Sequence, residues 1–164
     1  MQDGTENEIL ATVEASVPRR WFAMAMLVGL GATSLYVSFS TPPALGWQLF
    51  LIAVGVISLW AAMRLWQATS LRIELTDTEL RCSDGTMIAE VADIVAMDRG
   101  FFAFKPSNGF LIKTGSACGA RTWRPGLWWR MGRRIGIGGV TPGSQTKFMS
   151  ETIAAMMAKR DGAF

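Results

Sequence analysis

Histidine is absent from this 164-residue chain, and other side chains that usually carry chemistry are scarce. The absence removes the commonest general base near neutral pH, the catalytic triads built on it, and the usual neutral ligand of haem iron or chlorophyll magnesium. The two cysteines, Cys82 and Cys118, are too few and too scattered for a disulfide framework or a good metal site. We therefore expect reduced thiols, no metal and no cofactor.

Charge is also scarce, and its scarcity is local. Only 18% of the residues are charged, against roughly a quarter in soluble domains. The 43 consecutive residues from Trp21 to Met63 include no Lys, Arg, Asp or Glu. A bilayer core about 30 Å thick requires about 20 helical residues per crossing, so this run predicts two crossings and a turn.

The turn is expected at residues 40–46, because Pro42 and Pro43 cannot continue a helix interior. This predicts transmembrane helices at about 20–40 and 47–68. The first helix has a face of small residues, which we expect to pack against the second helix or a partner helix; its members are Ala25, Gly29, Gly31 and Ala32. A buried hairpin of a soluble protein is the alternative, but so small a core covers two all-apolar helices poorly.

Flanking cations predict the orientation of the two helices. Arg19 and Arg20 precede the first helix and Arg64 ends the second, whereas the turn carries no cation. The positive-inside rule then places both termini in the cytoplasm. The acidic start does not resemble a signal peptide, so we expect a retained anchor. No ionisable residue lies within the crossings, which makes transport or ion conduction by this chain alone unexpected.

Residues 1–19 are expected to form a short cytoplasmic tail. Thr5 and Glu8 have the spacing of a capping box, followed by an apolar stripe of Ile9, Leu10 and Val13, so a short amphipathic helix is one interpretation. At this length a helix is marginal without a surface to lie on, and a frayed, solvated terminus is the favoured expectation. Docking on the domain behind the membrane, or on a partner, are the alternatives.

Residues 69–164 change to an alternating pattern that predicts a small antiparallel sheet or barrel of about six or seven strands. Asp84-Gly85 is a hairpin signal, because both residues tolerate a tight turn. Further runs are DIVAM, FFAFK, GFLIKT and RRIGIGGV. A closing helix begins near Thr141 and Pro142, ends at Lys159 to Gly162, and carries an apolar stripe of Phe148, Ile153, Met156 and Met157. The fold class is therefore α+β, with a transmembrane hairpin first.

This order of elements resembles the bacterial pleckstrin-homology-like (PH-like) domains that follow a pair of membrane helices. The stretches that carry the resemblance are LRIELTDTELRCSDG, AEVADIVAM and RRIGIGGVTPGSQTKFMSETIAAMM. It implies a binding or scaffolding module more than an enzyme. Lipid-reading members of the wider superfamily carry cations on the first loop between strands, whereas Asp77 and Glu79 stand here, which argues against phosphoinositide recognition in that mode.

Basic residues collect in one half of this domain. Between Asp98 and Glu151 there are nine cations and no acid, and residues 121–134, RTWRPGLWWRMGRR, contain five arginines and three tryptophans. The segment suits an anionic lipid surface, where charges add, or a protein partner, where tryptophan and arginine act as anchors. Nucleic acid ranks third. The candidate binding residues are Arg121, Trp123, Arg124, Trp128, Trp129, Arg130, Arg133 and Arg134. At least one of the three tryptophans is expected to be buried, and Trp123 is the first choice because it alternates with arginines as a strand residue would.

These observations predict a non-catalytic accessory or assembly subunit of a larger inner-membrane complex. It would bind an integral membrane partner through its cytoplasmic PH-like domain. The partner is favoured over lipid because adjacent Trp128 and Trp129 give more anchor area than an electrostatic patch requires. The alternative is a protein that binds anionic phospholipid on its own. An enzyme is not expected, because the scattered acids fall at turns and strand edges; they are Asp77, Glu79, Asp84, Asp93 and Asp98.

Overall fold

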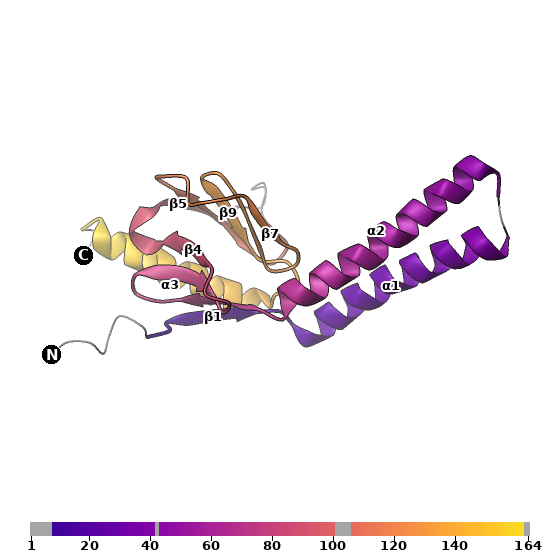
Figure 1. Ribbon diagram of the computed structural model, residues 1–164. Coiled ribbons are helices and arrows are strands. Elements are labelled where there is room, and N and C mark those ends of the chain that lie inside the picture. The colour runs from indigo at the N-terminus through magenta and orange to yellow at the C-terminus, as the bar shows by residue number, and fades with distance from the viewer. Residues whose placement is uncertain (1–7, 42, 101–105, 163–164) are drawn as a thin grey trace. The chain divides into compact units, whose positions relative to one another are not determined.

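The computed structural model describes residues 8–41, 43–100 and 106–162. The chain divides into two units (Figure 1): a helical hairpin, Val17–Gln67, and a second unit made of Met1–Ser16 with Ala68–Phe164. The second unit therefore contains residues from both sides of the hairpin.

The hairpin consists of two helices, α1 (Val17–Ser40) and α2 (Leu45–Thr69). Both are long and apolar enough to cross a membrane, which confirms the predicted helix pair, although each begins slightly earlier than expected. Only 17% and 22% of their most apolar windows are buried. Both helices are therefore largely exposed within this chain.

A seam of small residues joins the two helices. On α1 the buried residues are Gly31, Ser34 and Ser38. A Cβ added to Gly31 would lie 2.8 Å from a side-chain carbon of Leu59, and one added to Gly55 would lie 2.6 Å from Leu35. Small residues therefore let the backbones approach closely. Gly29 meets nothing within 4 Å, so Gly31 is the glycine of the expected small face that packs on α2.

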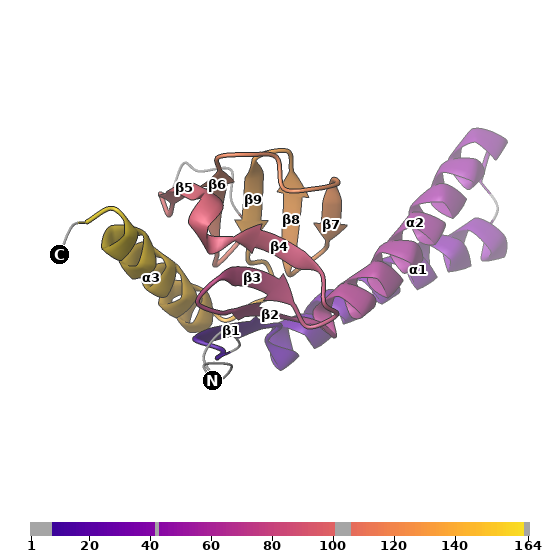
Figure 2. The same ribbon diagram turned by 60° about the vertical axis from the view of Figure 1, so that its left-hand side comes forward.

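The second unit contains two antiparallel sheets, a short 3-10 helix and a long helix (Figure 2). The four-stranded sheet has the order β1 (Ala11–Glu14), β2 (Arg72–Leu75), β3 (Glu79–Cys82) and β4 (Met87–Glu90). The five-stranded sheet has the order β5 (Ile94–Asp98), β6 (Phe110–Thr114), β9 (Arg134–Ile137), β8 (Trp128–Met131) and β7 (Thr122–Arg124). The helices are η1 (Val91–Asp93) and α3 (Gly143–Arg160).

The N-terminal segment corrects the expected tail. Residues 11–14 are neither frayed nor helical but form β1, in which Val13 pairs with Ile73 of β2. Ala11 and Val13 are buried, whereas the residues between and after them are not. This alternation has a period of two, and pairing with β2 supplies the surface that a short helix would have lacked. Of the alternatives, docking on the domain that follows the helices is the one confirmed.

The strand count also exceeds the expected six or seven. The Asp84-Gly85 hairpin is confirmed, since Gly85 has a φ of 82° between β3 and β4. The run FFAFK lies outside the described residues. The additional strands are β1, β7 and β8. The described strands form one four-stranded and one five-stranded antiparallel sheet, and among these strands no ladder joins the two sheets.

The two sheets and α3 share one hydrophobic core. The four-stranded sheet contributes Ile73, Leu80 and Ile88, the five-stranded sheet contributes Phe110, Ile135 and Trp128, and α3 contributes Met149 and Ile153. Phe148 was expected on the inner stripe of the helix but is 56% exposed. Consecutive helical residues point in different directions, and Met149 occupies the inward position instead.

Candidate partner-binding surface

The tryptophan- and arginine-rich segment 121–134 forms strands β7 and β8 and the turn that leads into β9. Gly126 and Gly132 have φ values of 79° and 61° in the two turns. The strands pair so that Trp123 lies opposite Trp129. Because side chains alternate between the faces of a sheet, the segment is divided between the core and the outer surface.

Trp128 and Arg130 belong to the inner face. Trp128 is 1% exposed and lies opposite Ile137 of β9, so the expectation that it anchors a partner is wrong. Arg130 is 7% exposed and does not contribute to a cationic surface. The sequence interpretation treated the adjacent pair Trp128-Trp129 as one anchor, whereas the register directs the two indoles to opposite faces.

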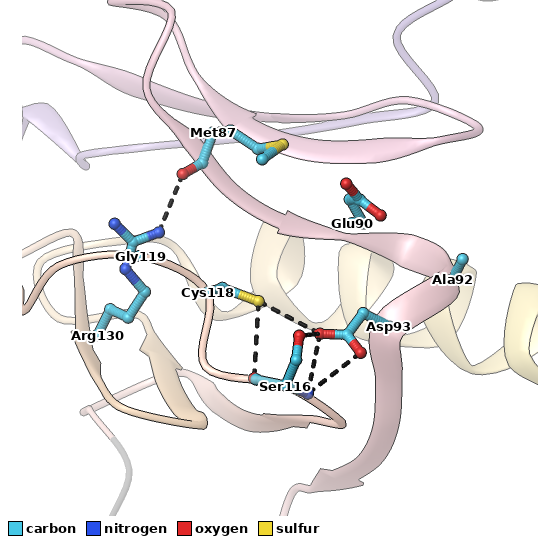
Figure 3. Close-up of a pocket in the computed structure, with 8 residues that line it drawn as sticks. All are labelled: Met87, Glu90, Ala92, Asp93, Ser116, Cys118, Gly119 and Arg130. Atoms are coloured by element: carbon cyan, nitrogen blue, oxygen red, sulfur yellow. Dashed lines mark hydrogen bonds between the residues drawn. The ribbon is translucent and has the colours of Figure 1, made fainter.

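Arg130 instead connects the two sheets. Its Nη1 donates to the carbonyl oxygens of Met87 at 3.0 Å and Ile88 at 3.1 Å, on β4. Its Nε donates to the carbonyl of Ala120 at 3.0 Å, and its Nη2 to Thr122 Oγ1 at 3.4 Å. The guanidinium thus links strands between which no ladder exists, and Figure 3 shows its contact with Met87.

The other arginines of the segment differ in their exposure and in the groups that their guanidinium contacts. Arg124 is half-buried, and its Nη2 lies 2.9 Å from Asp84 Oδ2. Partial burial raises the pKa of Asp84, but hydrogen bonds from Thr86 and the nearby Arg124 outweigh it and lower that pKa below its usual value. Arg133 is exposed and donates from Nε to the carbonyl of Thr114 at 3.0 Å. Arg121 and Arg134 are also exposed.

Trp123 and Trp129 lie together on the outer face of the five-stranded sheet. The expectation that at least one of the three tryptophans is buried is confirmed by Trp128, but the choice of Trp123 is wrong, since Trp123 is 53% exposed. Trp129 is half-buried because its indole lies over Gly136, its partner on β9. Leu111 follows in the same cross-strand row on β6. This row therefore places two indoles and the side chain of Leu111 on the face of the sheet that points away from the core.

Two cations lie opposite each other on the same face. Lys113 of β6 pairs in register with Arg134 of β9, and both are exposed. Their neighbours in this row are Ala96 and Met131, which carry no compensating charge. Neither cation forms an ion pair within the described ranges. Like charges directly opposite each other destabilise a sheet, so folding does not account for this arrangement.

Next to these cations the outer face is hollowed into a depression of about 340 Å³, lined by Ala96, Met97, Asp98, Leu111, Lys113, Trp129 and Arg134. Asp98 is exposed, and its Oδ1 accepts a hydrogen bond from the amide of Gly100 at 2.7 Å.

Lys113 was not among the candidate site residues, although it belongs to the acid-free tract. Its place opposite Arg134 depends on the register of β6 and β9, which the sequence does not show.

A second hollow of about 510 Å³ lies near Arg130 (Figure 3). Ser116 Oγ donates to Asp93 Oδ2 at 2.7 Å, and this bond lowers the pKa of Asp93 most strongly. The Cys118 thiol donates to the same carboxylate at 3.4 Å. Burial and the charge of Asp93 raise the pKa of Cys118, so the reactive thiolate is disfavoured. These contacts hold the β6–β7 loop against η1.

Both cysteines are free thiols, Cys82 buried and Cys118 half-buried. Across residues 8–41, 43–100 and 106–162 there is no group of three or more His, Cys, Asp or Glu side chains placed to hold a metal ion.

Comparisons with family models, with curated proteins and with solved structures find no match to this chain. The surface chemistry of the chain itself therefore carries the functional proposal.

Proposed function

We propose that this chain is a two-pass protein of a bacterial inner membrane with both termini in the cytoplasm. Its PH-like domain acts without catalysis, as an accessory or assembly subunit of a larger membrane complex. The partner binds the outer face of the five-stranded sheet. The observation that carries this proposal is the cross-strand pair of exposed Trp123 and half-buried Trp129 on the outer face, beside the exposed pair Lys113–Arg134.

The strand pairing supports an even number of crossings. Glu14 of β1 pairs with Arg72 of β2, and each strand is separated from its helix by two residues. Both ends of the hairpin must therefore emerge on the same side of the membrane. Arg19, Arg20 and Arg64 near those ends favour the cytoplasmic side.

The composition of the outer face supports binding. Tryptophan and arginine are the residues that most often dominate interface energies, because they bury much area and form directed hydrogen bonds. A membrane tether keeps such a face at high local concentration near other membrane proteins. Anionic lipid is the second candidate, because exposed cations near a bilayer are attracted to acidic headgroups by about 1 kcal/mol each.

The topology is tested with a reporter that is active only outside the cytoplasm. It should be active when inserted at Ala44 and silent when fused after Phe164. The opposite pattern would place the domain outside the cytoplasm and end the proposal.

Partner binding is tested by gentle detergent extraction of the full chain, followed by native gel electrophoresis and mass spectrometry. The variant Trp123→Ala/Trp129→Ala should lose about 2 kcal/mol or more of binding, roughly a 30-fold weaker retention of the complex. Phe148→Ala is the matched control, because it removes an aromatic ring that is 56% exposed on α3. Equal retention by the two variants, with both folded, would contradict the proposal.

A further inference from the structure

We infer that the depression beside Trp129 receives an acidic segment of a protein partner. An apolar side chain of that segment enters the depression, and a neighbouring carboxylate pairs with Lys113 and Arg134. The inference rests on the proposed function, and it specifies the chemistry of the partner at the same surface.

The charges define the acidic half of this ligand. Lys113 and Arg134 are opposite each other in register, exposed, and without an ion pair in the described ranges. A carboxylate placed between them would turn a repulsive pair into two attractive contacts. Arginine also offers a planar fork of N–H donors that matches a carboxylate.

The shape of the face defines the apolar half. Gly136 has no side chain, and the indole of Trp129 occupies the space above it. The indole thus forms one wall of a hollow of about 340 Å³, and Leu111 and Ala96 line it with apolar surface. A concave apolar site next to fixed charges suits a side chain and a carboxylate held at a set spacing on one chain.

Asp98 favours a protein over a lipid surface. This exposed carboxylate lines the same depression as the two cations. A planar anionic headgroup layer would repel it, whereas a peptide can meet it with a backbone amide or a basic side chain. A face that carries both signs is typical of electrostatic complementarity between proteins.

The experiment places a photoreactive benzophenone amino acid at Met131, beside Arg134, in the full-length chain in its native membrane. Met131 is 53% exposed. The same amino acid at Phe148 on α3 is the control position. Adducts are identified by mass spectrometry, which distinguishes a peptide from a phospholipid. We expect the probe at Met131, and not at Phe148, to label a peptide with a net negative charge.

Two charge variants then test the pairing. Lys113→Gln/Arg134→Gln should reduce the adduct yield at Met131 at least 10-fold. Arg72→Gln/Lys159→Gln removes two exposed cations on β2 and α3 and should leave the yield unchanged. The Tm of the first variant should equal or exceed that of the native protein, because the like-charge pair is gone. Changing the acids of the labelled peptide to lysine should abolish labelling, and adding Lys113→Glu/Arg134→Glu should restore it.

The possible outcomes separate this inference from the proposed function. A labelled peptide that is neutral or basic, or a yield insensitive to Lys113→Gln/Arg134→Gln, overturns the inference while a binding function stands. A phospholipid adduct alone overturns it in favour of the lipid surface. No adduct at Met131 in membranes that contain the chain overturns both.

Discussion

The indole of Trp129 lies over Gly136, so that a Cβ on this glycine would come within 2.5 Å of Cε2 of the ring. The two residues are cross-strand partners on β8 and β9. Glycine is unfavourable within a strand, since it gives up conformational freedom and offers no side chain to pack. Here its small size lets the indole approach the backbone of β9 and form a wall of the outer depression.

Gly136→Ala should therefore displace the indole without unfolding the domain. Gly136 does not have a positive φ, so alanine fits the backbone, and the expected loss of stability is about 1 kcal/mol. The shifted ring should weaken partner retention and change tryptophan fluorescence. Gly143→Ala is the control, because its nearest contact would be 3.9 Å away. Native partner retention by Gly136→Ala would show that the position of Trp129 does not matter.

The face assignment of residues 121–134 illustrates what the sequence could and could not predict. The composition of the segment pointed to a surface, but only the pairing of β8 with β9 determines that Trp129 faces outward and Trp128 inward. A shift of one residue would exchange them, and nothing local in the sequence fixes that choice. The like-charge pair of Lys113 and Arg134 was hidden for the same reason.

Elements specified by local signals were predicted well. The pair of long apolar helices, the Asp84-Gly85 turn and the C-terminal helix each depend on neighbouring residues, and the structure confirms all three. Strand β1 was missed because it has only four residues and its partner, β2, follows the entire helical hairpin in sequence. Isolated strands of this length carry too weak a pattern to identify.

Packing between the helices is tested at Gly31. Gly31→Leu should separate α1 from α2, because its side chain would meet Leu59 and the carbonyl of Gly55. Without a hydrophobic driving force inside a bilayer, close backbone packing supplies much of the association energy. We expect faster proteolysis of the detergent-extracted protein and altered native-gel mobility. Gly29→Leu, at a position with no neighbour within 4 Å, should behave as the native protein. Identical behaviour of the two variants would contradict close packing of α1 on α2 at Gly31.

The hydrogen bonds that Asp93 accepts from Ser116 and Cys118 should make the stability of the protein depend on pH. The pKa of Asp93 is lowered in the folded protein, chiefly by the Ser116 hydroxyl. Its contribution is therefore present above the unfolded carboxyl pKa of about 3.9 and is lost as pH falls through the folded value. Asp93→Ala should lower the Tm at pH 7, and the difference from the native protein should shrink below about pH 4. A difference that stays constant with pH would show that Asp93 acts through packing alone.

Replacing Arg130 tests whether an arginine of segment 121–134 stabilises the fold instead of binding a partner. Arg130→Met keeps the aliphatic volume but leaves the carbonyls of Met87, Ile88 and Ala120 without their donor. Each hydrogen bond to a charged group contributes about 1.5–3 kcal/mol. The hollow beside Arg130 is large enough for water, which would replace part of this hydrogen-bond free energy. We expect a loss of about 3 kcal/mol in the free energy of unfolding.

Arg133→Met is the matched control for that measurement. The side chain of Arg133 is exposed and donates one hydrogen bond, to the carbonyl of Thr114. Because water replaces an exposed hydrogen bond more fully than a buried one, its loss should cost about 1 kcal/mol or less. The two variants have the same net charge, so a simple electrostatic patch would weaken equally in both. Denaturant unfolding of the full chain in detergent should separate them, with only Arg130→Met shifting the midpoint strongly. Equal midpoints would mean that the two sheets are held together by the shared core and not by the guanidinium.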